Sequence, residues 1–181
     1  MAATRSETSA ADWRLRELGA VDDDAAWALR RRALGESPTA FGSHLDELPS
    51  LPAYRALLEE RRTTQAQRVV GAFMPVATGE ALVGVVTVVR ASRLKSRHLA
   101  NLYGLYVAPE ARRVGVGRAL VAAAVRAASE LGAERLELTV TADNDGARRL
   151  YDEAGFRTWG VQPRAIRVAG RYFDEAYMAL A

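Results

Sequence analysis

The segment Arg112–Arg118, which reads Arg-Arg-Val-Gly-Val-Gly-Arg, constrains this chain more than any other. An apolar, strand-like run over 102–107 and a Pro109-Glu110 turn precede it, and an alanine-rich helical pattern over 119–131 follows it. A strand, a basic glycine-containing loop and a helix start favour anion binding, because free N–H groups and the helix dipole point to one place. Glycine lets the backbone approach a phosphate closely, and arginine supplies matching charge. The segment predicts a pyrophosphate site, although a helix that merely begins at a glycine turn fits the same letters.

Spacing separates two phosphate-binding patterns. A dinucleotide fingerprint, G-x-G-x-x-G, would begin at Gly115 and would need a third glycine where this chain has Leu120. The first glycine of that fingerprint also follows its strand directly, whereas seven residues lie between Val107 and Gly115 here. The letters match R-x-x-G-x-G instead, with Arg112, Gly115 and Gly117. This pattern resembles the acetyl-CoA loop of the GCN5-related N-acetyltransferase (GNAT) family.

A second segment, 144–156, resembles the family's signature N-x-x-A-x-x-L-Y-x-x-x-G-F. One helix and one strand fit between the two motifs, as the family requires. Asn144 can cap a helix, Leu150 and Tyr151 recur at helical spacing, and Gly155 can end the helix. An ordinary capped helix with a core tyrosine would explain this segment alone. Two motifs in this order and separation favour the GNAT family.

Hydrophobic periodicity and the positions of glycine and proline predict alternating strands and helices in one domain, residues 12–181, after a flexible arm at 1–11. We expect strands at 13–18, 69–74, 82–90, 98–107 and 134–141, and two more after Gly155. We expect helices at 23–34, 53–62, 119–131 and 144–154, a loop or broken helix at 35–52, and Arg30–Arg32 on a solvated helix face. The resemblance implies an α/β (α+β) fold of the GNAT-like acyl-CoA N-acyltransferase type, with a mixed sheet of about seven strands and about four flanking helices.

Composition excludes several classes of site. The chain has no cysteine, so disulfides, thiolate metal sites and a covalent acyl-cysteine route are impossible. Two histidines are too few for a histidine-rich metal site, and no apolar run reaches the ~18 residues of a membrane span. A formal net charge of +3 without a long basic run gives no nucleic-acid footprint. We expect a cytoplasmic enzyme with no metal, no membrane contact and no nucleic-acid partner.

The resemblance also assigns roles to the residues of the two motifs. Main-chain groups of Leu105, Tyr106 and Val107 would pair with the pantetheine arm of acetyl-CoA, and Asn144 would reach the same arm. Tyr151 would be the general acid for the departing thiolate, since the ordinary pKa of a tyrosine, about 10, is near that of a thiol, about 8.5. A packing role beside CoA is the alternative for Tyr151. The pyrophosphate would lie on Arg112, Arg113, Val114, Gly115, Val116, Gly117 and Arg118.

The general base is not evident from the sequence. Where many relatives carry a strand glutamate this chain has Asn101, whose amide can hold a water molecule but cannot accept a proton. His98, Tyr103 and Glu137 are nearby candidates, and no pattern singles one out. An α-amine, with a pKa of about 7.7–8.0, needs less help than a lysine amine at about 10.4. We therefore expect a small-molecule or peptide α-amine acceptor rather than a protein lysine.

The resemblance implies an N-acetyltransferase that moves the acetyl group of acetyl-CoA, its co-substrate, to a primary amine by direct attack in a ternary complex. The missing glutamate leaves a second hypothesis, a non-catalytic acetyl-CoA-binding module. A dinucleotide-binding oxidoreductase is the third. By family analogy the loop 35–52, with Pro38 and Phe41, is one wall of the acceptor site, and a homodimer is expected.

Overall fold

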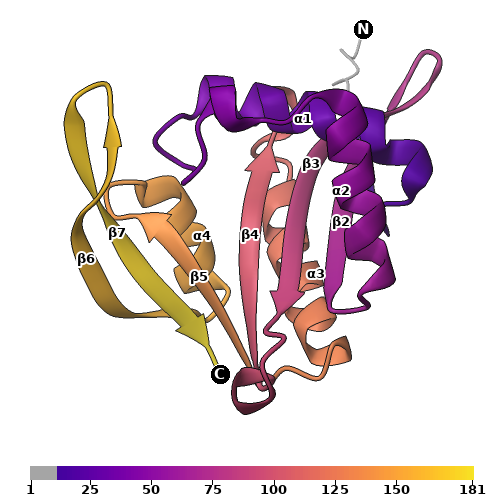
Figure 1. The fold of residues 1–181 in the computed structure, drawn as a ribbon. Helices are drawn as coiled ribbons and strands as arrows, with labels where there is room; N and C mark the ends of the chain where they lie inside the picture. The colour runs from indigo at the N-terminus through magenta and orange to yellow at the C-terminus, as the bar shows by residue number, and fades with distance from the viewer. Residues whose placement is uncertain (1–11) are drawn as a thin grey trace, which may run out of the picture.

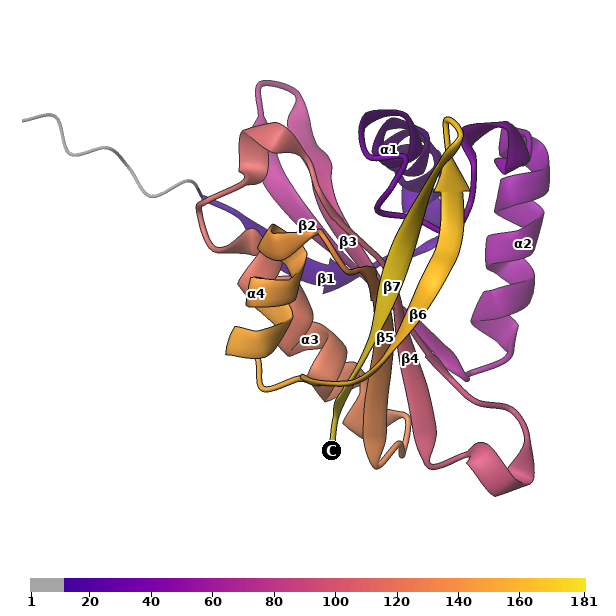
Figure 2. The same cartoon turned by 90° about the vertical axis from the view of Figure 1, so that its left-hand side faces the viewer.

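The computed structural model describes residues 12–181, so the expected N-terminal arm lies outside the described residues. Its strands form one sheet in the order β1-β2-β3-β4-β5-β7-β6. Figure 1 labels β2 to β7, and β1 is labelled in Figure 2. The strands are β1 Arg14–Glu17, β2 Gln67–Val76, β3 Gly79–Arg90, β4 Leu99–Val107, β5 Arg135–Thr141, β6 Arg157–Val168 and β7 Arg171–Leu180.

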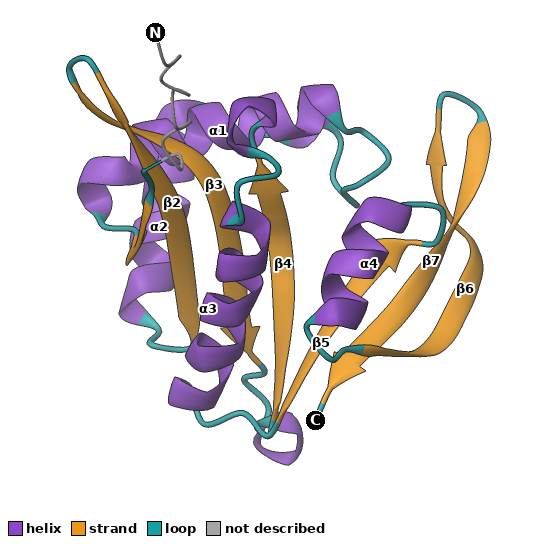
Figure 3. Cartoon of the chain, turned by 180° about the vertical axis from the view of Figure 1, so that it is seen from behind, coloured by secondary structure: helices purple, strands orange, loops and turns teal. Residues whose placement is uncertain are grey.

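Four α-helices cover the two faces of the sheet. They are α1 Asp23–Glu36, α2 Leu51–Thr63, α3 Val116–Glu130 and α4 Asp145–Glu153. Helices α1 and α2 lie on one face, and α3 and α4 lie on the other (Figures 2 and 3). Strands β4 and β5 are parallel, while the other neighbouring strands in the described residues are antiparallel. Helix α3 makes the crossover between the two parallel strands, as the sequence predicts.

Small side chains let α3 lie close to the sheet. Its buried stripe includes Leu120, Val121, Ala124 and Ala127, so much of the contact surface is alanine. On the facing strand, a Cβ atom placed on Gly84 would lie 3.0 Å from Cδ1 of Leu120. The close approach fixes the N-terminus of α3 beside the end of β4, where the phosphate loop must lie.

The structure confirms the expected mixed sheet with seven strands and four helices. Two helix starts differ from the expectation. Helix α3 begins at Val116 rather than Ala119, because Gly115 takes the N-cap position in a left-handed conformation. Helix α2 begins at Leu51, because Pro52 occupies the first turn, where the N–H that proline lacks is not needed. No helix in the described part of the chain is long and apolar enough to cross a membrane.

Candidate acyl-donor and acceptor site

The two parallel strands pair only at one end. Their register runs from Leu99 opposite Arg135 to Asn101 opposite Glu137, and no further pairs follow. From Leu102 to Val107 the backbone of β4 therefore has no partner on its β5 side within the described residues. The strands diverge from that point (Figures 1 and 3). Backbone groups left unpaired in this way are available to an extended ligand that lies along β4.

A β-bulge lies in this unpaired half of β4. Thr87 of β3 faces Tyr103 and Val85 faces Tyr106, so Gly104 and Leu105 together oppose a single β3 residue. Gly104 has φ +61°, a conformation in which a residue with a side chain would be strained. The bulge changes the direction of the backbone at Gly104 and Leu105. The sequence analysis named Leu105 as a residue whose backbone could pair with the pantetheine arm, but it did not name Gly104.

The loop that follows β4 presents a run of free donors. In residues 12–181, none of the backbone N–H groups from Arg113 to Arg118 donates a hydrogen bond to a protein acceptor. Arg113 with φ +65° and Gly115 with φ +91° turn the loop into the first turn of α3. Consecutive N–H groups at a helix start form an anion-binding concavity. The geometry fits a pyrophosphate at the position that the sequence predicts.

Arginines of the loop are held at its edges. The Nε of Arg112 donates to the carbonyl of Val107 at 2.9 Å, so this carbonyl already has one protein partner. Arg118 pairs with Glu153 of α4 at 2.7 Å, and both side chains are exposed. Trp13 donates from Nε1 to the carbonyl of Val114 at 3.1 Å. Sequence reasoning had missed Trp13, because nothing in the sequence connects β1 with this loop.

Helix α4 lies beside the divergence of β4 and β5, and Asn144 is its N-cap. The Asn144 side chain accepts a hydrogen bond from the N–H of Ala147 at 3.2 Å. An amide that caps through its oxygen still has two N–H donors. Those donors are the groups of Asn144 that could reach a pantetheine arm.

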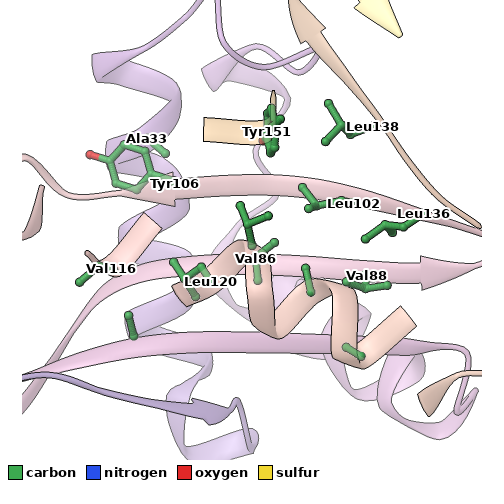
Figure 4. Close-up of a cluster of buried hydrophobic side chains, with 14 of the residues drawn as sticks. Ala33, Val86, Val88, Leu102, Tyr106, Val116, Leu120, Leu136, Leu138 and Tyr151 are labelled. Atoms are coloured by element: carbon green, nitrogen blue, oxygen red, sulfur yellow. The ribbon is translucent and has the colours of Figure 1, made fainter. Parts of the chain in front are cut away.

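Tyr151 is buried on α4. Its ring stands edge-on to Phe156, with 5.7 Å between the centroids, and Figure 4 shows it next to Leu138 on the β5 side of β4. Burial raises the pKa of the Tyr151 hydroxyl above its ordinary value. Among the described residues its hydroxyl has no hydrogen-bond partner. A protonated hydroxyl without a protein acceptor is suited to donate to a ligand.

The opposite face of the sheet carries a cavity of about 850 Å³ under α1 and α2. Asn101, Tyr103 and Gly104 of β4 line it, so the bulge borders both the cavity and the divergent edge of β4. The lining of this cavity includes no residue of the loop 35–52, which we expect to form one wall of the acceptor site. Phe41 of the loop packs instead against Tyr106, at 6.5 Å between ring centroids.

The candidate bases differ in their surroundings. Glu137 is in register with Asn101, as neighbouring strands predict, and it accepts a hydrogen bond from Nε of Arg135 at 2.7 Å. His98 is exposed just before β4. The Tyr106 hydroxyl donates to Glu36 at 2.5 Å, and burial together with this bond raises the pKa of Tyr106 to about 12. Of the candidate bases, Tyr103 is exposed and lines the cavity. Asn101 also lines the cavity and stands where the resemblance implies a glutamate.

The expectation that Arg30–Arg32 form a solvated face is wrong for Arg30. Arg31 and Arg32 are exposed, whereas Arg30 is half-buried and lines the cavity. No group of three or more His, Asp or Glu side chains in the described residues could hold a metal ion.

Comparisons with known proteins agree with this arrangement. A model of the acetyltransferase (GNAT) family matches residues 37–156, which include both sequence motifs. The chain belongs to this family. A GNAT-family acetyltransferase structure from Streptococcus pneumoniae superimposes with a TM-score of 0.80 at 25% identity and covers 93% of this chain and 99% of that one. The GNAT fold that the sequence predicts is thereby confirmed.

Two other similar proteins have names or structures that specify a ligand. A phosphinothricin acetyltransferase from Sinorhizobium meliloti, solved in complex with acetyl-CoA, has a TM-score of 0.79 at 24% identity and covers 93% of this chain and 87% of its own. A mycothiol acetyltransferase of Renibacterium salmoninarum is 29% identical over 147 residues, which are 80% of this chain and 40% of the relative. This chain thus spans less than half the length of that curated relative.

Proposed function

We propose that this GNAT protein transfers the acetyl group of acetyl-CoA to a primary amine. The observation that supports this most is the run of unbonded N–H groups from Arg113 to Arg118, placed at the end of the unpaired half of β4. A donor held there by its pyrophosphate would extend along β4 to the bulge at Gly104. The cavity under α1 and α2 reaches the same bulge from the other face, so donor and acceptor would meet at Gly104.

The proposed reaction is direct attack in a ternary complex. The neutral amine nitrogen attacks the thioester carbonyl, the new C–N bond forms, and the C–S bond breaks. Tyr151 gives its proton to the leaving thiolate. Burial raises the pKa of Tyr151 further above that of a free thiol, about 8.5, so the transfer depends on the same burial raising the pKa of the CoA thiol. Asn101 would hold the water molecule that removes the proton from the attacking amine.

We propose that one domain, residues 12–181, carries out the whole reaction. The proposed acceptor is a small-molecule or peptide amine. A cavity of about 850 Å³ has the size of a small-molecule site. A water molecule held by Asn101 would be only a weak base, which favours an amine that is partly neutral at physiological pH. A homodimer is part of the proposal, on family resemblance alone.

The main alternative is a module that binds acetyl-CoA without turnover, which Asn101 at the base position favours. A dinucleotide-binding oxidoreductase has less support, since Leu120 stands where its fingerprint needs glycine. Melting with acetyl-CoA, CoA and NAD tests the ligand. At about 100 times its dissociation constant, a ligand of the folded state stabilises it by roughly 2.7 kcal/mol. A shift with NAD and none with acetyl-CoA would overturn the proposal.

Acetyl transfer against a panel of amines then separates the enzyme from the binding module. We expect CoA release that depends on the amine. Binding of acetyl-CoA with no transfer to any amine, at any pH from about 6 to 10, would favour the module.

A further inference from the structure

Arg30 lies on the inner face of α1. It shares this face with Ala26, four residues before it, and Ala33, three residues after it, which are 7% and 1% exposed. Arg31 and Arg32 lie on the outer side of the helix, where Arg31 stacks on Trp27. An arginine in the buried stripe of an amphipathic helix is uncommon and calls for a partner.

The guanidinium of Arg30 lies beside the bulge of β4. A Cβ atom placed on Gly104 would be 3.9 Å from its Nη1. Its Cζ lies over the ring of Phe41, 4.8 Å from the centroid. Within residues 12–181 its side chain makes no ion pair and no hydrogen bond. The ring covers one face of the guanidinium and leaves its N–H edges to the cavity.

Burial of this cation without an anion is unfavourable. Desolvation lowers the pKa of Arg30 and outweighs an opposing effect from Tyr54. A guanidinium has five N–H donors and no acceptor, so an unpaired one in a half-buried site loses water without replacing it. A negatively charged group from a ligand would restore those hydrogen bonds.

The carboxylates that line the cavity are already engaged. Asp23 accepts two hydrogen bonds from Arg62, at 2.8 and 3.0 Å, and Glu17 lies 3.6 Å from Arg68. Neither acid is therefore free to neutralise Arg30. The cavity keeps a positive excess next to the bulge.

Two side chains of α2 extend the positive region. Tyr54 and Arg61 are seven residues apart, so they lie on the same face of the helix, and both line the cavity. Burial raises the pKa of Tyr54, while Arg30 and Arg61 both act in the opposite direction, so the hydroxyl lies near both cations. Arg90 also lines the cavity, but its Nη1 lies 3.4 Å from a Cβ placed on Gly132, at the far end of α3.

Building on the proposed acetyl transfer, we propose that the acceptor is an amine that carries a carboxylate or phosphate group, bound by Arg30 with Tyr54 and Arg61. The remaining lining includes Leu18, Leu58, Val69 and Val85, which suits an apolar body between the amine and the cavity mouth. Because Arg30 is next to Gly104, the anionic group would lie a few bonds from the reacting amine. Polyamines would be repelled by the same arginines.

Matched pairs of amines test this proposal. L-leucine and L-leucinamide differ by a carboxylate charge, and O-phosphoethanolamine and ethanolamine differ by a phosphate group. Spermidine serves as a polycationic amine. For each amine, kcat/KM for CoA release is measured, and calorimetry measures binding to the CoA-loaded protein without need of turnover. We expect the wild type to prefer the anionic member of one pair by roughly 10- to 100-fold, the size of a charge-assisted hydrogen bond.

Variants of two neighbouring arginines complete the test. Arg30→Gln should lower kcat/KM for the preferred anionic amine by roughly 10- to 100-fold, mainly through KM, and leave its neutral analogue unchanged. Arg30→Lys should keep part of the preference, because the charge remains. Arg31→Gln removes the same charge one residue away and should leave both amines unaffected. Acetyl-CoA binding should be the same in all variants.

The outcomes are distinguishable. Preference for a neutral amine or spermidine, equal effects of Arg30→Gln and Arg31→Gln, or no binding of either member of any pair would each overturn the anionic acceptor. Acetylation of neutral amines as fast as, or faster than, their anionic analogues would do so while leaving the proposed transferase intact. Binding of an anionic amine that depends on Arg30, but without acetyl transfer, would support the site and overturn the transferase instead.

Discussion

A Cβ atom placed on Gly117 would lie 3.4 Å from Cδ2 of Leu150, so the space between the first turn of α3 and α4 holds little more than one methyl group. The same atom would lie 3.9 Å from Cγ2 of Val107 at the end of β4. The phosphate loop therefore packs against the helix that carries Tyr151. The sequence places the loop outside the core, and Arg112 to Gly115 are indeed exposed, whereas Gly117 in the first turn of α3 is half-buried.

Two substitutions at Gly117 should separate the effect of side-chain volume from the effect of replacing glycine with any other residue. Gly117→Ala places its methyl group at an ordinary contact distance, so fold and CoA affinity should stay close to wild type. Gly117→Val adds methyl groups against Leu150, Val107 and the phosphate, and should lose CoA affinity sharply and cost about 1–3 kcal/mol of stability. Calorimetry with CoA and urea unfolding measure both effects. Unimpaired CoA binding by Gly117→Val would place the phosphate elsewhere.

Gly115 should tolerate even alanine poorly. Its φ of +91° is unfavourable for any residue with a Cβ atom, so Gly115→Ala should destabilise the fold by roughly 1–3 kcal/mol. The strain would also redirect the N–H groups that follow, and CoA affinity should fall. Gly117→Ala is the matched control, because it adds the same methyl group two residues away without a positive φ. Equal behaviour of the two variants would contradict a role for loop geometry.

Tyr151→Phe tests the proton donor. The ring would still pack on Phe156, so the KM for acetyl-CoA should change little, while turnover should fall about 10²-fold or more. That loss corresponds to roughly 2.7 kcal/mol of transition-state stabilisation. The measurement is steady-state transfer to the best amine across pH 6 to 10. Full turnover at every pH would make Tyr151 a packing residue, with water as the proton source.

Asn101→Ala tests the water at the base position. We expect turnover at neutral pH to fall by about 10-fold, at the low end of general-base effects, because the amide only holds the water. The defect should shrink as the pH approaches the pKa of the acceptor amine, since a neutral amine needs no base. Asn101→Asp, which could accept the proton itself, should restore activity. A defect that is the same at all pH values would indicate a structural role for Asn101.

Tyr106 should make the fold sensitive to alkali. Its pKa in the folded state is raised to about 12, whereas an unfolded tyrosine titrates near 10, so between these values the folded state holds the proton that the unfolded state has lost. Stability is then fully present below pH ~10 and falls as the pH rises, by at most about 1.4 kcal/mol per pH unit for one group. Tyr106→Phe should show a shallower decline in urea unfolding from pH 9.5 to 11.5. Tyr103→Phe, at an exposed position of β4, controls for the loss of a phenol, and parallel curves for wild type and Tyr106→Phe would contradict the assignment.

The sequence by itself was sufficient for the elements and for the family. Period-2 and period-3.6 patterns are local properties, so β5, α3 and the cap at Asn144 could be read from short windows of the chain. The two motifs at 112–118 and 144–156 are local as well, and they predicted the GNAT family that the comparisons confirm. The starts of helices were predicted least accurately. Gly115 and Pro52 determine where α3 and α2 begin, but neither residue changes the hydrophobic pattern from which the helices were predicted.

Only the tertiary structure decided which side chains meet. The letters Arg30-Arg31-Arg32 are chemically identical, and nothing but the orientation of α1 over the sheet places Arg30 in the cavity and its neighbours in solvent. The contacts of Trp13 with Val114, of Gly117 with Leu150 and of Arg30 with Gly104 join residues far apart in the chain. Such contacts arise when helices pack on a sheet that diverges between β4 and β5. A pattern read along one strand or helix carries no information about that packing.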